Sequence, residues 1–523
     1  MKAERLFRVL GMADPALVEE ALEARRGTWR RWAAAAACLA LIAGLGVPWL
    51  AGGGFKGYGM SGGAAPGDSG GASGNAAAGG EGGVSFMSYG GSVLPLTTAE
   101  DSTGLTAERE VIWDFAPGAY PDGEPRQWGA EVTDSYTLHN STEEVIAVTA
   151  LYPFTGSFDS LTEIRPHAAA DGGAVETTLY AGAYSGGFQS TFGAEIPDTM
   201  NLDGLSSWEG YQALLGSGAY LEQALGDYPV LDIPAVVYEF SDFAAPHETY
   251  PAATQAVSIH IDEEETTIFT YGFNGMECGE GFRRYSYFVP DGMRNEPDLK
   301  LLVVLGEDIG AYGLQGYEDG GCGRGEEIEG VSCAVVRSET TLDAVLDRLC
   351  RYHRERYTQN RAGRENAFDM VPYRLYRGAV AELMAQYGAL SGAPVDRYAD
   401  GRLDDILSET MTHDRVLYLS FPVTVPAGGS VQVECGLWKT PSYDFACAGS
   451  GNEGLQGYDL MTRLGSSLRF TRQSAALMNT ENVEITGQDY GFDLDGGVTA
   501  VELDLEREHY FLEMRVKEGL SSE

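Results

Sequence analysis

The stretch that decides the fold is residues 416–438, VLYLSFPVTVPAGGSVQVECGLW. Its two halves, Val416–Val425 and Val431–Trp438, are dominated by β-branched and aromatic residues, a composition typical of strands. Between them, Pro426–Gly429 combines proline with glycine, and that combination favours a turn. The stretch therefore predicts two consecutive short strands joined by a tight connection.

Short runs of the same kind occur through most of the chain. Many short strands separated by turns are typical of a β-sandwich, so we expect a mainly β fold. Val132–Leu138 alternates with period two and is predicted to form a hairpin with Val145–Tyr152. We expect further strands at Val236–Phe240, Ala256–Ile261, Thr266–Phe273, Leu301–Leu305, Val331–Val336, Ser467–Thr471, Val483–Thr486, Val498–Leu505 and Tyr510–Val516.

Helical periodicity interrupts the strands at 208–225 and again within 340–410. Trp208–Leu225 is one candidate helix, with glycines at 216 and 218 breaking it. Thr341–Arg356 is the clearest, because apolar residues recur on one face and Thr340 with Asp343 resembles a capping box. Leu375–Leu390 is a third. The predicted class is therefore α+β, with a helical insertion at 340–410 between β-rich blocks at 86–339 and 411–523.

The N-terminal region has the pattern of a membrane anchor. Residues 32–51 are twenty residues without a charge, and a helix of that length spans about 30 Å, the thickness of the hydrocarbon layer. Four arginines lie within Arg25–Arg31, whereas Lys56 alone follows closely. The positive-inside rule then predicts that 1–31 is a cytoplasmic helical segment and that the C-terminal body lies outside. A cleaved signal peptide, cut after Gly53, is the alternative.

Residues 52–85 are predicted to be a disordered tether. They contain 15 glycines in 34 residues, so they have little apolar surface to bury. A coil of this length has a root-mean-square span of roughly 30 Å. Such a tether would hold the body away from the membrane and let it reorient.

Charge excludes one class of partner and suggests another. The chain has 35 basic and 77 acidic residues, a net charge of −42, which argues against nucleic-acid binding. Residues 348–377 are locally basic, with eight arginines and three acidic residues. We take Arg348, Arg351, Arg354 and Arg356 as candidate ligand-binding residues for an anionic cell-wall polymer or a protein partner. The alternative is that they pair with acidic residues of the same chain.

Residues typical of catalysis or metal binding form no recognisable motif. The seven histidines show no metal-ligand spacing, and His509 is expected at the surface. Asp493–Gly496 with Glu502 resembles a calcium loop, but Gly491 stands where the first carboxylate belongs, so a hairpin turn is favoured. Six cysteines outside the apolar segment are sparse enough that disulfides and free thiols both stay open. We therefore predict no catalytic residue, metal or cofactor.

The first fifty residues resemble a layout found in uncharacterised membrane-anchored proteins of Gram-positive gut bacteria. The similar phrases are Leu6–Phe7, Val18–Ala21, Trp29–Trp32 and Ala36–Leu39. Some proteins with this layout resemble anti-sigma factors, and the resemblance implies a membrane regulator.

Three functions follow as hypotheses from these patterns. The first is a membrane-anchored extracytoplasmic binding or sensing module without enzymatic activity. The second is an anti-sigma-like transmembrane regulator that signals through its short cytoplasmic N-terminus. The third is an extracellular hydrolase, which would need two carboxylates brought together by the fold.

Overall fold

The computed structural model describes residues 89–100, 103–120, 123, 125–126, 128–184, 208–244, 252–290, 299–318, 322, 327–361, 364–392, 401–444 and 452–517. These residues divide into two compact units. Unit 1 holds the described parts of 229–351 and 381–408, and unit 2 holds those of 89–228, 352–380 and 409–517. Strands dominate both units, so the mainly β prediction is confirmed.

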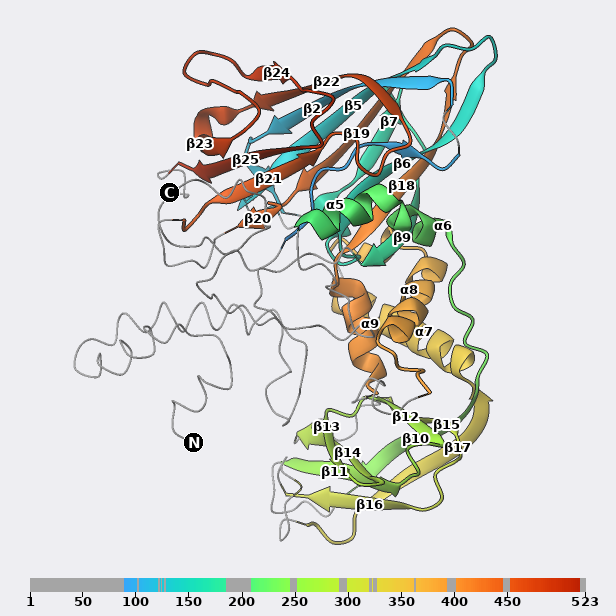
Figure 1. The fold of residues 1–523 in the computed structure, drawn as a ribbon. Helices are drawn as coiled ribbons and strands as arrows, with labels where there is room; N and C mark the ends of the chain where they lie inside the picture. The colour runs from blue at the N-terminus through green and yellow to red at the C-terminus, as the bar shows by residue number, and fades with distance from the viewer. Residues whose placement is uncertain are drawn as a thin grey trace, which may run out of the picture. The chain divides into compact units, whose positions relative to one another are not determined.

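Unit 1 contains two four-stranded antiparallel sheets (Figure 1). They share one hydrophobic core, to which Phe240 and Leu302 contribute from one sheet and Val257 and Tyr285 from the other. The first sheet has the order β12 (Thr266–Tyr271), β15 (Lys300–Gly306), β10 (Pro234–Ala244) and β17 (Ser332–Thr341). The second has the order β13 (Gly275–Gly279), β14 (Phe282–Pro290), β11 (Ala252–His260) and β16 (Tyr312–Tyr317).

The helices of 340–410 are present, with small differences at their ends. They are α7 (Leu342–Asn360), α8 (Tyr373–Gln386) and α9 (Leu403–Thr412). The predicted apolar face of α7 is buried at Leu342, Val345, Leu346 and Leu349. Its cap differs from the prediction, because the hydroxyl of Thr341, not of Thr340, accepts a hydrogen bond from the Ala344 amide at 3.3 Å.

Unit 2 contains three larger sheets and a short two-stranded one, β3 (Gly118–Ala119) with β4 (Pro125–Arg126). The largest has the order β24 (Ala500–Glu502), β22 (Arg469–Met478), β2 (Leu105–Asp114), β5 (Ala130–Asn140), β19 (Ser430–Lys439), β7 (His167–Ala170) and β8 (Gly173–Ala174). The second has the order β1 (Thr97–Thr98), β6 (Ile146–Gly156), β18 (Arg415–Val425) and β9 (Thr178–Tyr184). The third has the order β20 (Tyr443–Asp444), β21 (Gln456–Met461), β25 (His509–Val516) and β23 (Val483–Gln488).

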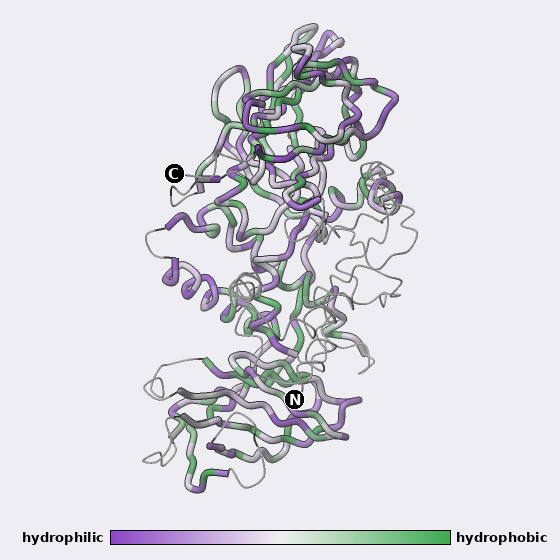
Figure 2. Tube along the Cα trace, turned by 90° about the vertical axis from the view of Figure 1, so that its left-hand side faces the viewer, coloured by the Kyte–Doolittle hydropathy of each residue, from purple (hydrophilic) through white to green (hydrophobic). Residues whose placement is uncertain are grey.

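Side chains of β2 and β5 in unit 2 alternate between buried and mostly half-buried positions. β5 alternates at every position, and β2 follows the same period, because successive side chains point to opposite faces of a sheet. In Figure 2, hydrophobic and hydrophilic residues are interspersed along the tube. Across the sheets, Trp113 of β2 meets Tyr458 of β21 with ring centres 5.4 Å apart. The buried faces of two sheets therefore form one core.

Helical segments complete unit 2. The break predicted at Gly218 is confirmed, because the segment forms α5 (Trp208–Ser217) and α6 (Ala219–Leu225), with Gly218 at a φ of 76° between them; the break predicted at Gly216 is wrong, since Gly216 lies within α5. Trp208 and Tyr211 of α5 are buried in a hydrophobic cluster with Val416 and Tyr418 of β18. Shorter turns of helix are α4 (Leu161–Ile164), η2 (Ala367–Asp369) and η4 (Thr480–Asn482).

The two strands of 416–438 are confirmed, but they lie in different sheets. β18 pairs with β6 and β9, whereas β19 pairs with β5 and β7. Gly428 turns the chain between them with a φ of 61°. The hairpin predicted from Val132–Leu138 and Val145–Tyr152 is wrong: both strands form, as β5 and β6, but they belong to different sheets.

The compact units do not follow the linear blocks expected at 86–339, 340–410 and 411–523. Strands from 97–184 pair with strands from 415–478 in two sheets of unit 2, so they belong together despite the intervening residues. Residues 229–351 form most of unit 1. The structural division is therefore set by strand pairing between distant segments.

The predicted anchor and tether lie outside the described residues. This applies to the cytoplasmic segment 1–31, the apolar segment 32–51 and the tether 52–85. Among the residues that the structure does describe, no helix has the length and apolar character needed to cross a membrane.

A buried ion pair lies at the centre of unit 2. The Arg109 guanidinium donates from Nε and Nη2 to the two carboxylate oxygens of Asp134 at 2.8 and 2.7 Å, and both side chains are fully buried. The Tyr136 hydroxyl donates to the same carboxylate at 2.7 Å, and Arg109 Nη1 donates to the Met461 carbonyl at 2.7 Å. The pair therefore connects β2, β5 and β21.

We predict that Asp134→Ala lowers the free energy of unfolding by about 3–5 kcal/mol, because the Arg109 charge is left buried without a partner. Urea titration followed by tryptophan fluorescence measures this change. The matched control is Glu502→Ala, which breaks the exposed ion pair between Glu502 and Arg472 and should cost far less. Equal losses in the two variants would contradict the prediction.

Candidate functional site

The four arginines predicted to bind a ligand all lie along α7. Arg348 makes two hydrogen bonds to the carboxylate of Glu239, at 2.8 and 2.9 Å. Arg351 pairs with Asp347, one turn earlier on the helix, at 2.9 Å. Both arginines are exposed, so these pairs are worth little on their own. They nevertheless neutralise two of the four charges locally.

Arg354 and Arg356 have other partners. Arg354 donates to the Phe368 carbonyl at 3.2 Å and lies over the Phe368 ring at 5.4 Å. Arg356 donates to the Tyr352 hydroxyl at 3.0 Å. Arg348 and Arg351 thus have the acidic partners that the alternative interpretation expected, whereas Arg354 and Arg356 donate to a carbonyl and a hydroxyl. A role for the four arginines in binding an anionic ligand stays a prediction.

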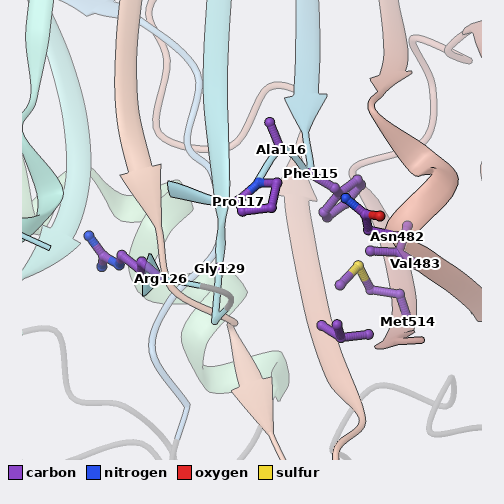
Figure 3. Close-up of a pocket in the computed structure, with 9 residues that line it drawn as sticks. Phe115, Ala116, Pro117, Arg126, Gly129, Asn482, Val483 and Met514 are labelled. Atoms are coloured by element: carbon purple, nitrogen blue, oxygen red, sulfur yellow. The ribbon is translucent and has the colours of Figure 1, made fainter. Parts of the chain in front are cut away.

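A pocket opens at one end of the unit 2 sheets, where β2 ends and β23 begins, near the last residues of β25 (Figure 3). Its volume is about 350 Å³ when the open solvent at its mouth is included, and its enclosed space holds about one water molecule. Most of its lining is apolar. The lining residues are Phe115, Ala116, Pro117, Arg126, Gly129, Asn482, Val483, Met514 and Val516.

Backbone pairing fixes the walls of this pocket. The Phe115 amide donates to the Met478 carbonyl at 3.1 Å. This hydrogen bond holds the residue that follows β2 against the last residue of β22. Val483 is paired with Val516 between β23 and β25. The Lys517 amide then donates to the Asn482 carbonyl at 2.9 Å, leaving the Asn482 side-chain amide beside the pocket in Figure 3. The pocket is thus formed by regular structure on two sides.

Arg126 is the one ionisable residue of the lining, and its charged end is engaged elsewhere. Its Nη1 donates to the Glu163 carbonyl at 2.8 Å, and its guanidinium lies 4.6 Å from the centre of the Trp438 ring. Burial lowers the pKa of Arg126 from its usual value. In Figure 3 the guanidinium points away from Met514, so the aliphatic stem faces the pocket.

A second polar cluster surrounds Asp459 in the interior of unit 2. The Tyr89 hydroxyl donates to one oxygen of Asp459 at 2.7 Å, and His509 Nε2 lies 2.7 Å from the other. The indole of Trp208 lies 4.5 Å from the imidazole, centre to centre. An aspartate that orients a histidine is one part of many hydrolase sites. Here the aromatic ring of α5 packs on the histidine, which points to a structural role.

The surface location expected for His509 is wrong. Its side chain is 9% exposed, because the residue begins β25 instead of lying in a connection. The run His509–Leu512 is buried throughout. The run of apolar residues after the histidine is typical of a buried central strand. Its partner Asp459 lies fifty residues away, and no local pattern connects the two.

Lys439 is a buried lysine at the end of β19. Its Nζ donates to the carbonyls of Thr440 at 2.8 Å and Gly90 at 3.3 Å. Burial lowers the pKa of this amine to about 8, and the carboxylates of Asp414 and Asp459 oppose the effect. The sequence gives no sign of this, because a lysine at the end of a strand is ordinarily solvated.

Two further predictions from the sequence concern the turn at 493–498 and the state of the cysteines. Residues 493–498 form a tight turn, in which Asp493 and Val498 pair and the Gly496 amide donates to Asp493 at 2.9 Å. The hairpin-turn interpretation is therefore confirmed. Among the described cysteines, Cys333 and Cys435 are free thiols.

Comparison of the chain with known protein families, with curated proteins and with solved structures found no match.

We predict that Lys439→Met raises the free energy of unfolding at pH 7 by up to about 3 kcal/mol, since each pKa unit corresponds to about 1.4 kcal/mol. The pKa of Lys439 is about 8 in the folded chain against an ordinary 10.5. Between these two pH values the unfolded wild-type chain holds a proton that the folded chain has lost, so wild-type stability rises with pH.

The advantage of the methionine variant should accordingly shrink from pH 8 to pH 10.5, as urea titrations at several pH values would show. Lys517→Met, at an exposed lysine, is the control and should change the pH profile little. A constant difference between Lys439→Met and wild type over this range would refute the assignment.

Proposed function

We propose that this chain is a membrane-anchored, extracytoplasmic binding module whose ligand presents an apolar group to the pocket lined by Phe115, Met514 and Val516. The observation that carries the binding role is the composition of that pocket. Its walls are mostly apolar, and the side-chain amide of Asn482 offers a hydrogen-bond donor and an acceptor. The guanidinium of Arg126 donates to the Glu163 carbonyl and so is turned away from the pocket. Binding pockets commonly combine apolar walls with a few polar groups.

A catalytic role is less well supported by the same pocket. Catalysis by hydrolysis needs a nucleophile or a pair of carboxylates close to the bound substrate. The histidine–aspartate pair of His509 and Asp459 lies inside the core, with Trp208 against the imidazole. These groups are placed to hold α5 against the sheets, so a binding role fits the geometry better than the hydrolase hypothesis.

The membrane anchor is inferred from the sequence of residues 1–85. The uncharged segment 32–51, the arginines before it and the glycine-rich residues after it support display of the body outside the cytoplasm. Signalling through residues 1–31, as the anti-sigma-like layout implies, is a further role that the same topology would permit.

We predict that protease added to intact cells cleaves the chain beyond residue 90 and spares a fragment that contains residues 1–51. Immunoblotting with tags at both ends measures this, and a cytoplasmic protein that stays intact serves as the control. Protection of the whole chain, or a mature N-terminus near Gly54, would contradict the proposed topology.

We predict that Val516→Trp weakens ligand binding at least tenfold, because the indole fills space that the ligand's apolar group would occupy. Displayed peptides selected on the detergent-solubilised chain supply the ligands, and fluorescence anisotropy gives their Kd. Val498→Trp is the matched control, since Val498 is an exposed valine that does not line the pocket. Equal affinities for wild type and Val516→Trp would show that binding occurs elsewhere.

A further inference from the structure

Strand β17 forms one edge of the first sheet of unit 1 (Figure 1). Among the described strands it pairs with β10 alone, on one side. It is ten residues long, whereas the other edge strands of unit 1, β12, β13 and β16, have five or six. Val336 at its middle is 61% exposed. A long exposed edge is a template for a further strand, because its outer row of backbone groups is unpaired.

The pairing with β10 identifies the backbone groups of β17 that face outward. The Leu342 amide donates to the Ile233 carbonyl at 2.8 Å, which continues the register of the ladder between the two strands. Hydrogen-bonded pairs alternate along an antiparallel ladder, so every second residue of β17 is bonded to β10. The residues in between direct their amides and carbonyls away from β10, toward the open edge. They include Val335, Arg337 and Glu339.

Two of these outward-facing residues carry opposite charges. Arg337 and Glu339 are two residues apart on one face of the strand, and Nη1 of Arg337 lies 3.0 Å from Oε1 of Glu339. Arg337 also pairs with Asp308 at 2.9 Å. The Arg337 and Glu339 side chains are 43% and 74% exposed, so both are accessible to a neighbouring strand. If a second β17 ran antiparallel to the first with Ser338 opposite itself, each Arg337 would lie opposite a Glu339.

The other registers of such a pair are less favourable. A centre between two residues would set outward-facing groups opposite inward-facing ones. A centre at Arg337 or at Glu339 would place two like charges opposite each other, which is destabilising. A centre at Val336 would leave both charges opposite uncharged residues and would extend past the regular part of the ladder with β10, which covers 334–341. The centre at Ser338 keeps the pairing within that regular part.

We propose that two copies of this chain associate through β17, as an antiparallel pair centred on Ser338. The backbone groups of Arg337 and Glu339 hydrogen-bond to those of Glu339 and Arg337 in the second copy, and the charged side chains alternate in sign around the centre. One strand from each copy is a small interface, so the association is weak in solution. Copies anchored in the same membrane, as proposed above, would meet at a high effective concentration.

Engineered cysteines test the register in the full-length, detergent-solubilised chain. Ser338→Cys places two thiols in a pair that is not hydrogen-bonded, where Cα atoms lie about 4.5 Å apart, a distance that a disulfide spans. Mild oxidation should produce a disulfide-linked dimer on non-reducing gels, with the link mapped to position 338 by mass spectrometry. The matched control is Val336→Cys, also exposed, because two copies of this site would lie about 13 Å apart along the strands, too far for a disulfide.

Charge reversal tests the pairing of Arg337 with Glu339. Arg337→Glu sets carboxylates opposite each other and Glu339→Arg sets guanidinium groups opposite each other, so each variant alone should self-associate about tenfold more weakly than wild type in sedimentation velocity. An equimolar mixture of the two variants restores opposite charges at every position and should associate as wild type does. Recovery in the mixture requires both variants to be folded, so it separates pairing from misfolding.

Three outcomes would overturn the proposal. The first is a wild-type chain that stays monomeric at every concentration while Ser338→Cys forms no dimer. The second is a disulfide yield for Val336→Cys that equals or exceeds that for Ser338→Cys, which would reveal random collision or another register. The third is a mixture of the charge variants that associates no better than either variant alone, although both keep the circular dichroism of wild type. If a charge variant loses that spectrum, the two cysteine variants decide.

Discussion

The ion pair between Arg109 and Asp134 is the interaction on which the rest of unit 2 depends. Its two charges are fully buried, so they are tolerated only because they satisfy each other and the groups around them. Asp134 also accepts from Tyr136, whose hydroxyl in turn accepts from the Leu96 amide at 2.8 Å. The network thereby fixes the segment before β1 and the position of β21 relative to the central strands.

The two pockets of unit 2 differ in the chemistry of their linings. The pocket beside Phe115 is apolar and lies at an end of the sheets, where a ligand can enter. The pocket beside Lys439 includes the buried side chains of Lys439 and Tyr152 in its lining. Polar groups in the core, such as His509 with Asp459, are tied to neighbouring side chains. Buried polar groups in this unit thus hold the elements in place, and an apolar surface is left for binding.

Local patterns in the sequence predicted the elements well and their assembly poorly. The two strands of 416–438 form as expected, because their composition favours extended backbone and the glycine at 428 permits the turn. Their separation into different sheets was not predictable, since it depends on pairing with β5 and β6 almost three hundred residues earlier. The same long-range pairing places 229–351 in a unit of its own, although a linear division joined it to 86–228.

The sequence alone determined the mainly β character, the helices of 340–410 and the acidic charge, because each follows from residue type and period within a short window. Only the tertiary structure decided which groups meet. Arg348 lies against Glu239, His509 against Asp459, and Lys439 beneath the segment that begins at Tyr89. These partners are distant along the chain, and burial lowers the pKa of Lys439. The cost of desolvating a charge depends on the surrounding atoms, which no local pattern specifies.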